Sequence, residues 1–282
     1  MVWGALALVA GPGAAEALDG WSSAPQTLAG VLLWAAWAAG LLATLVPRPT
    51  GLTVLRTEAA LFVVAAALAA PWASGARAVA LAGTVVVAAV ALLPATGSRF
   101  VNGAAYGSER RFFLRVPTAL LYGPLPVAVL VAGAGTVSGP LLLADGRIVA
   151  GVAATALGWP AAAAAGRSLY ALSQRWAVLV PAGIVLKDPL TLLDPFLFLR
   201  DKVAGLRPLP YPQSPASDIV DLRLGAVKGS LVLELAEEAA VALSKGRQRG
   251  GEIVNARRIA FAPTESAALL ADAGERRIVA AG

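Results

Sequence analysis

The chain contains no cysteine and no histidine among its 282 residues. Without cysteine it has no disulfides, thiol redox chemistry or cysteine nucleophile, and without either residue it has no metal site ligated by His or Cys. Histidine is also the usual general base near neutral pH. From the sequence we therefore assign no catalytic residue, no metal ligand and no cofactor.

Charged residues are scarce as well. They make up 14% of the chain, whereas an average soluble domain has about 25%. The net charge is nevertheless +6. Most of this charge lies in the apolar half of the chain, where membrane topology explains it better than nucleic-acid binding. We therefore expect no nucleic-acid partner.

Long apolar blocks are abundant, and the mean hydropathy of the chain is +0.72. A block of about 20 apolar residues matches a helix that crosses about 30 Å of hydrocarbon. Five such blocks are Thr27–Val46, Thr57–Trp72, Ala78–Ala95, Thr118–Val137 and Ile148–Ala165. They predict a multi-pass membrane protein.

A shorter apolar block, Val2–Ala15, opens the chain and is interrupted by Gly11-Pro12-Gly13. It is either a further membrane helix or a signal segment. The sequence thus predicts a membrane α-helical bundle of five to six transmembrane helices in residues 1–174. We expect Glu58, near the start of the second long block, to be an interfacial residue rather than part of an ion path.

The charges between the blocks predict the topology. Basic residues gather after every second block: Arg48 and Arg56, then Arg99, Arg110, Arg111 and Arg115, then Arg167 and Arg175. Because Lys and Arg mark cytoplasmic loops, these loops and the C-terminal tail are expected in the cytoplasm. High Ala, Gly, Val and Arg with few Lys indicates a GC-rich bacterial genome, and hence a bacterial plasma membrane.

The loop Ser98–Val116 combines arginines with aromatic residues. This combination suits phospholipid head groups at a membrane surface, docking of the C-terminal domain, or a topogenic loop with aromatic anchors. A proton-transfer role for Tyr106 and Glu109 is a further alternative. The candidate lipid or partner contacts in this loop are Asn102, Tyr106, Glu109, Arg110, Arg111 and Arg115.

From Trp176 the hydrophobic period changes to two, which predicts β-strands. The predicted strands are Ala177–Pro181, Gly183–Lys187, Phe196–Leu199 (with a continuation to Leu206 as the alternative), Asp218–Leu224, Ser230–Leu235, Ala239–Leu243 and Arg257–Ala262. Thr264 is the expected N-cap of a final helix. This order predicts a small all-β barrel or sandwich with a C-terminal helix in residues 175–282.

The element order, together with the opening hairpin Trp176–Asp188, resembles that of pleckstrin-homology-like domains, including bacterial ones appended to membrane helices. The resemblance covers about residues 175–277 and implies binding of lipids, peptides or proteins rather than catalysis. The whole chain, with its Asn102–Arg115 loop, also resembles a family of uncharacterised actinobacterial multi-pass membrane proteins. That second resemblance implies no activity.

A basic, Gly-rich loop between two late strands contains Lys245, Arg247 and Arg249. Each basic residue near an anionic membrane surface contributes about 1 kcal/mol, so these three are candidate contacts for lipids of the inner leaflet. The alternative is a solvated loop. Asp188, Asp194 and Asp201 are acids that could hold Mg²⁺, but turns and strand ends are their commoner use.

The leading functional hypothesis is a non-enzymatic membrane scaffold or assembly factor. Its cytoplasmic domain would recruit an unknown protein partner or sense the lipid surface. The alternatives are a transporter or permease component with a regulatory tail, and a lipid-modifying enzyme that uses the Tyr106–Arg110 segment. The apolar spans and the absence of an inverted repeat argue against transport.

Overall fold

The structure is a computed structural model that describes residues 2–69, 74–210, 218–244 and 251–278. The chain divides into two compact units. Met1–Phe100 and Pro124–Tyr170 form the first, which we call the helical unit. Val101–Gly123 and Ala171–Gly282 form the second, which we call the β-rich domain.

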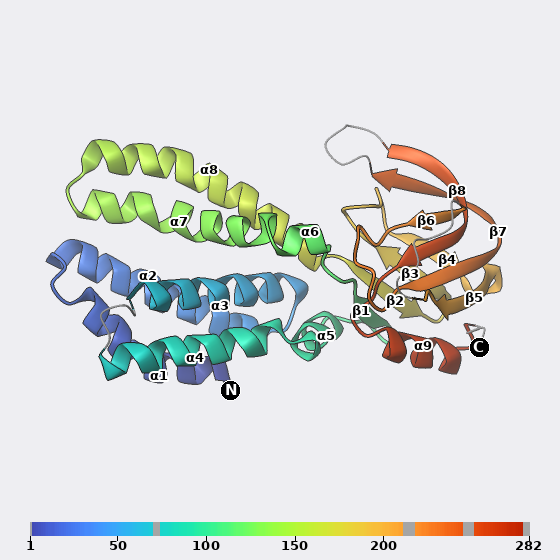
Figure 1. Cartoon of the computed structure of the whole chain (residues 1–282), viewed down its shortest axis with the longest axis horizontal. Coiled ribbons are helices and arrows are strands. Elements are labelled where there is room, and N and C mark those ends of the chain that lie inside the picture. Colours follow the sequence, from blue (N-terminus) through green and yellow to red (C-terminus); the bar gives the residue numbers. More distant parts are fainter. Residues whose placement is uncertain (1, 70–73, 211–217, 245–250, 279–282) are drawn as a thin grey trace. The chain divides into compact units, whose positions relative to one another are not determined.

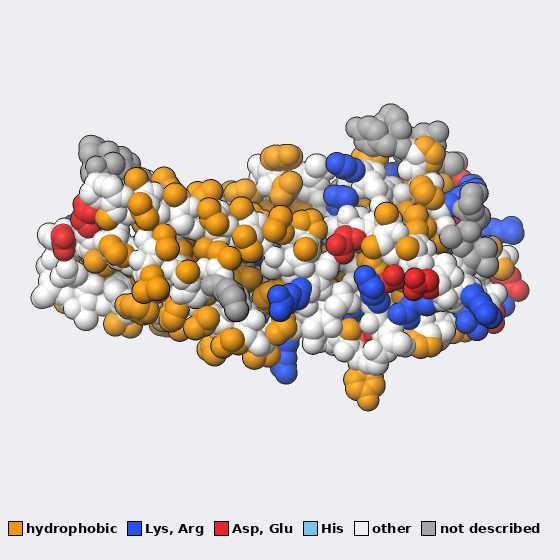
Figure 2. All heavy atoms as spheres, turned by 90° about the horizontal axis from the view of Figure 1, so that it is seen from below, with side chains coloured by type: hydrophobic (Ala, Val, Ile, Leu, Met, Phe, Trp, Pro, Cys, Tyr) orange, Lys and Arg blue, Asp and Glu red, His pale blue; other side chains and the backbone are white. Residues whose placement is uncertain are grey.

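The helical unit contains helices long and apolar enough to cross a membrane, as predicted (Figure 1). Five such spans lie within the described residues: α2 (Ser23–Leu45), α3 (Pro49–Ala69), α4 (Gly75–Leu92), α8 (Ile148–Ser173) and the stretch Thr118–Ala144, which includes α7 (Pro124–Ala144). Figure 2 shows hydrophobic side chains over much of the visible helical surface. The protein is therefore a multi-pass membrane protein.

The first apolar block forms α1 (Val2–Leu18), which packs against α2, α3 and α4. The Trp3 indole N–H donates to the carbonyl of Trp37 at 2.8 Å, and the Trp37 indole donates in return to the carbonyl of Trp3 at 3.2 Å. At the other end of α1, Arg77 donates to the Glu16 carbonyl at 3.0 Å. α1 is thus a member of the bundle.

The second predicted span starts earlier than expected. α3 begins at Pro49 rather than Thr57, so Arg56 and Glu58 lie within the helix. Proline is favoured at the first position of a helix, because its missing N–H would have no intrahelical partner there. Arg56 donates from Nε to the Ala91 carbonyl at the end of α4, at 3.1 Å.

Glycines allow the helices to approach closely. A Cβ atom placed on Gly135 of α7 would lie 2.6 Å from the Gly158 carbonyl oxygen of α8, which is shorter than van der Waals contact. The same atom on Gly13 of α1 would lie 2.7 Å from the Ala76 carbonyl oxygen of α4. Larger residues at these positions would force the helices apart.

The described part of the β-rich domain contains two four-stranded sheets, a short helix and a C-terminal helix. The first sheet has the strand order β1-β2-β3-β4, and these strands are Arg110–Phe113, Trp176–Val180, Gly183–Lys187 and Phe196–Leu199. The second sheet has the strand order β5-β7-β8-β6, and these strands are, in the same order, Val203–Pro208, Leu231–Ser244, Gly251–Phe261 and Ile219–Asp221. α6 is Thr118–Leu121, α9 is Ser266–Glu275, and the 3₁₀ turn Arg200–Lys202 joins β4 to β5.

The first strand, β1, comes from the loop between α4 and α7, far from the rest of the domain in the chain. It pairs antiparallel with β2, and Phe112 lies opposite Ala177. Phe112 and Leu114 belong to the same buried core as Leu269 and Ala273 of α9. Residues 101–123 are therefore part of the β-rich domain, although the sequence-based division placed them with the membrane helices.

Two strands that the sequence analysis predicted as separate form a single strand in the structure. Ser230–Leu235 and Ala239–Leu243 are both parts of β7, and the register with β8 shifts between Glu234 and Ala239. At this register shift the alternation of apolar and polar residues is interrupted, although the strand itself continues. The predicted continuation of the third strand to Leu206 is instead the 3₁₀ turn Arg200–Lys202 followed by the separate strand β5. β8 begins at Gly251 instead of Arg257.

The two sheets meet at single bridges, Leu114 with Pro263 and Leu192 with Leu243. Thr264 lies beside the first bridge, and the predicted cap there was wrong. α9 begins at Ser266 with Glu265 at its N-cap. The Thr264 amide N–H and hydroxyl both donate to the Phe113 carbonyl of β1, at 2.8 and 3.3 Å. Thr264 therefore joins the sheets instead of capping the helix.

Candidate functional site

Asn102, at the end of α5 (Pro94–Asn102), covers the outer edge of β1. Its side-chain oxygen accepts from the Arg111 amide N–H at 2.8 Å, and its side-chain nitrogen donates to the Arg111 carbonyl at 2.9 Å. The side chain thus acts as a neighbouring strand would, and it satisfies backbone groups on an exposed edge. This is a structural use of a residue that we considered as a lipid or partner contact.

Arg111 and Glu109 pair within the loop. Arg111 donates to Glu109 Oε2 at 3.0 Å, and its guanidinium lies 5.8 Å from the centre of the Trp176 ring. The hydrogen bond from Arg111 is the main reason why the pKa of Glu109 lies below its usual value. A carboxyl that serves as an acid or base near neutral pH needs the opposite shift. Glu109 is therefore suited to a structural pair.

Trp176 carries a second cation, the Lys187 ammonium, 4.6 Å from its ring centre. Lys187 also donates to Gln174 Oε1 at 3.0 Å. Burial, and then the charge of nearby Arg111, lowers the pKa of Lys187. An aromatic ring attracts a nearby cation, so the indole of Trp176 in β2 contributes to the contact with Arg111 of β1 and with Lys187 of β3.

Arg110 and Arg115 join β1 to the C-terminal elements. Arg110 pairs with Asp272 of α9 at 2.9 Å. The Arg115 amide N–H donates to the Ala262 carbonyl at 2.7 Å, and its guanidinium donates to the Thr264 carbonyl at 3.1 Å. Both arginines therefore contribute to the association of separate chain segments.

Tyr106 differs from its neighbours, because its side chain is 86% exposed. Its amide N–H donates to Glu109 Oε2 at 3.4 Å. Among the candidates in this loop, Tyr106 and Arg110 are classed as exposed, and Arg110 is the one of the two that pairs with α9. The candidates Lys245, Arg247 and Arg249 lie outside the described residues.

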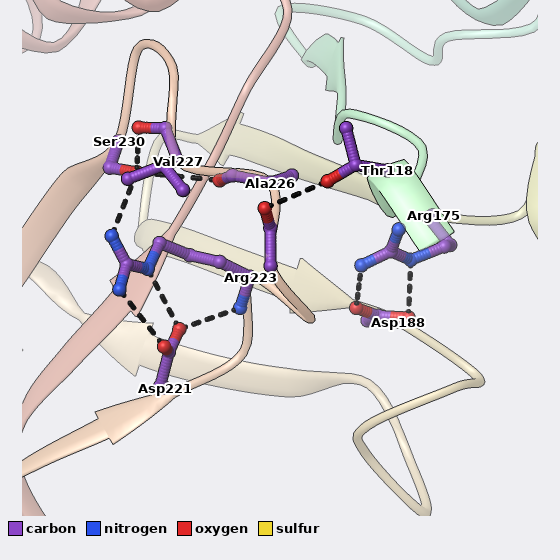
Figure 3. Close-up of polar contacts among 9 residues, drawn as sticks. Thr118, Arg175, Asp188, Asp221, Arg223, Ala226, Val227 and Ser230 are labelled. Carbon is purple, nitrogen blue, oxygen red and sulfur yellow. Dashed lines mark hydrogen bonds and ion pairs between the residues drawn. The ribbon is translucent and has the colours of Figure 1, made fainter. Parts of the chain in front are cut away.

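A buried ion pair lies where the chain enters the domain from α8 (Figure 3). Arg175 donates from Nε and Nη2 to the two carboxylate oxygens of Asp188, both at 2.7 Å. Arg175 also donates to the Arg115 carbonyl at 2.8 Å, and Asp188 accepts from the Leu190 amide N–H at 3.0 Å. Each residue is 1% exposed. The pair connects β2, β3 and the segment after β1.

The pair uses Asp188 structurally, as expected for an acid at a strand end. Sequence reasoning missed its partner, yet a signal was present. The β2–β3 register pairs Trp176 with Lys187, so one further step places Arg175 opposite Asp188. Extending the predicted hairpin by one residue would have found the pair.

A second arginine cluster holds the loop between β6 and β7, here called the 222–230 loop (Figure 3). Arg223 is 5% exposed and donates to both carboxylate oxygens of Asp221, at 2.9 and 3.0 Å. It also donates to the Ser230 hydroxyl at 3.3 Å. Within the same domain, the hydroxyl of Thr118 at the start of α6 donates to the Gly225 carbonyl at 2.9 Å.

A hollow in the helical unit is lined by the α1–α2 and α7–α8 turns, including Trp21, Pro25 and Leu141. Asp145 and Arg147 border it and pair with each other at 3.0 Å. Because their charges cancel, the hollow favours no charged ligand. Within the described part of the chain, no group of three acids could hold a metal ion.

Comparison of the chain with family models, with curated proteins and with solved structures gives no match. Most of the polar candidates in the loop lie in contacts that assemble the β-rich domain. Exposed apolar side chains such as Leu197 and Leu199 of β4 are further groups that a partner could contact.

Proposed function

We propose that the protein is a non-enzymatic membrane scaffold whose β-rich domain binds a protein partner at the inner surface of a bacterial plasma membrane. The observation that carries this proposal is the pairing of β1 with β2. Through it, the domain is connected to membrane helices at three points of the chain, after α5, before α7 and after α8. A tail on one flexible linker would have one such point.

The pairing also supports the proposed topology. Both β1 and β2 lie in one sheet, and the two spans between them in the chain return it to the same side of the membrane. Arg99 and Arg167, at the helix ends that lead into this domain, are basic, as cytoplasmic flanks are. Together these features favour a cytoplasmic location for the domain.

The partner surface that we propose is the outer edge of β4. Within the described residues β4 pairs on one side, with β3. Leu197 and Leu199 are 42% and 46% exposed. The Arg200 amide N–H donates to the Ala182 carbonyl across the β3–β4 ladder. In an antiparallel ladder every second residue forms such hydrogen bonds, so the N–H and C=O groups of Leu197 and Leu199 point away from β3. The unpaired backbone groups of an exposed apolar edge strand can form hydrogen bonds with a strand of a partner protein.

The strand order favours a pleckstrin-homology-like domain. A four-stranded antiparallel meander, a second sheet and a C-terminal helix packed on the shared core support this assignment. We propose that the first strand of this domain is supplied by the loop between α4 and α7. Domains of this class mostly bind lipids, peptides or proteins, which agrees with a scaffold.

The test is photo-cross-linking in cells, with a photoreactive phenylalanine at Leu197. Leu193, in the turn between β3 and β4, is the control because it is a leucine of similar exposure, at 49%. We expect a discrete protein adduct at position 197 that is absent at position 193. Leu199→Pro should abolish it, because proline removes an outward N–H and suits the φ of −64° at this position.

An adduct that survives Leu199→Pro, or that forms equally at both positions, would contradict strand addition at β4. Turnover of a lipid or nucleotide by the purified protein would contradict the non-enzymatic assignment.

A transporter component is the second candidate, and one observation favours it. Glu58 Oε2 is buried in the helical unit and has no hydrogen-bond partner among the residues that the structure describes. An ionisable residue within a span often marks a substrate or ion path. Uptake or conductance in proteoliposomes that Glu58→Gln abolishes would support this candidate over the scaffold.

A further inference from the structure

The tip of the 222–230 loop presents a leucine in an unfavourable backbone conformation. Leu224 has φ 52° and Gly225 has φ 85°. Glycine adopts such angles freely, whereas leucine does so at a cost in free energy. Yet the Leu224 side chain is 42% exposed and gains little from packing within the domain. A strained, exposed leucine indicates that its side chain is used by something outside the domain.

The base of the loop is held firmly, so the tip has a defined position. The Leu222 amide N–H donates to the Ala260 carbonyl at 2.8 Å, and its side chain is 2% exposed. Arg223 is fixed by Asp221 and Ser230, and Ala226 is 6% exposed. Leu224 and Gly225 thus project from a rigid support.

The loop is also bonded to the chain at the point where the fourth long apolar stretch begins. Thr118 donates to the Gly225 carbonyl at 2.9 Å, and Thr118 is the first residue of the candidate span Thr118–Ala144. Leu121 and Tyr122, a few residues further into this stretch, are 42% and 84% exposed. Tyrosine is typical of the boundary between lipid head groups and hydrocarbon.

We propose that the tip of the 222–230 loop, with Leu224 at its apex, inserts into the lipid bilayer that holds the protein's own helices. Exposed Lys228, four residues further along, lies where it can contact lipid phosphate. The bilayer is favoured over a protein because the loop is bonded to the start of a membrane span. This role is separate from the proposed partner surface on β4.

The chain contains no cysteine, so single cysteines can be introduced without removing others. Leu224→Cys and the control Leu197→Cys, at equal exposure, would be labelled with a nitroxide in the full-length protein. The probe membrane is vesicles of phosphatidylethanolamine and phosphatidylglycerol. Collision rates with oxygen, which enters lipid, and with a water-soluble nickel complex report the surroundings of each label.

We expect the ratio of oxygen to nickel collisions to be several-fold higher at position 224 than at position 197. Equal ratios would overturn insertion, and so would a label at position 224 that neither reagent reaches, because protein would then cover it. Leu224→Gly checks the role of the side chain, since glycine tolerates the positive φ. It should leave the domain folded, and a domain that unfolds would mean that Leu224 serves packing instead.

The two proposals fail separately. A water-exposed label at position 224 refutes membrane insertion and leaves the β4 surface untouched, whereas loss of the cross-link at position 197 refutes the β4 surface alone.

Discussion

In the helical unit, glycines let helices approach closely, whereas in the β-rich domain arginines join the elements. Gly135 meets Gly158 across α7 and α8, but Arg175 meets Asp188 and Arg115 across three segments. Hydrocarbon gives no hydrophobic drive between helices, so close packing must hold them together. At the boundary of a water-exposed domain, a charged side chain can be buried if every donor finds an acceptor.

The two units should therefore tolerate different substitutions. A side chain added at a glycine should disturb the helical unit, and a charge left unpaired should disturb the β-rich domain.

The largest effect is expected when β1 is removed. A fragment of residues 175–282 loses Phe112 and Leu114 from the core and leaves the edge of β2 unpaired. Each large apolar side chain contributes about 2 kcal/mol when buried. The fragment should be unfolded or aggregated by circular dichroism and size-exclusion chromatography. Joining residues 101–117 to its N-terminus through a short Gly/Ser linker should restore a folded monomer, and equal behaviour of both fragments would contradict the assignment of β1.

Asp188→Ala should come next, because it leaves the Arg175 charge buried without its partner. Breaking a buried pair in this way costs about 3–5 kcal/mol. Thermal unfolding of the β-rich domain within the full-length protein in detergent measures the loss. Replacing both residues, Arg175→Met with Asp188→Leu, should recover most of it.

The control for this pair is Lys202 with Glu237, which is exposed. Exposed pairs contribute little, so Lys202→Ala should leave the unfolding temperature unchanged. A similar loss at both sites would mean that burial is not what makes the Arg175–Asp188 pair important.

Gly158→Val tests the helical unit. The added side chain would collide with the Gly135 carbonyl, and overpacking of this kind costs about 1–3 kcal/mol. The control is Gly166→Val in the same helix, where a Cβ atom meets nothing within 4 Å. The thermal unfolding temperature in detergent should fall for Gly158→Val and should stay unchanged for Gly166→Val. If both fall equally, helix propensity rather than packing explains the result.

The smallest effect is expected for Asn102→Ala. It removes two hydrogen bonds to β1, each contributing about 1 kcal/mol. Hydrogen exchange at Arg111 should become faster, while exchange in β7 should not change. Unchanged protection at Arg111 would show that Asn102 does not hold the strand.

Much of the fold was predictable from local patterns. The long apolar blocks located the spans, because 20 or so consecutive apolar residues have few other uses. The alternation around Gly183–Lys187 and Phe196–Leu199 placed β3 and β4 at their observed bounds. These signals lie within short windows of sequence.

The contribution of β1 was not predictable in this way. Arg110–Phe113 is only four residues long and lies in a loop between spans, and its partner follows two membrane helices later. The basic and aromatic composition of the loop has a sufficient explanation in membrane topology. Docking of the domain was one of the alternatives, but strand pairing depends on contacts that no local pattern records.

The candidate site was predicted less well than the fold. Most of the loop residues that suited lipid head groups instead bind within the domain, because an arginine has the same preference for carboxylates and carbonyls as for phosphate. Leu224 drew no attention, because it was read as the last residue of the predicted strand Asp218–Leu224, whereas the observed strand ends at Asp221. Its backbone angle and exposure became visible only in three dimensions.

The most direct test of the central claim is a disulfide between β1 and β2 in this cysteine-free chain. Arg111 lies opposite Val178, at a position of the ladder where antiparallel Cα atoms approach to about 4.5 Å. Arg111→Cys with Val178→Cys should cross-link under mild oxidation in native membranes. The control, Arg111→Cys with Val180→Cys, is displaced by two residues and should not, since bridging requires Cα atoms within about 7 Å. Absence of the first cross-link, or equal formation of both, would contradict the account.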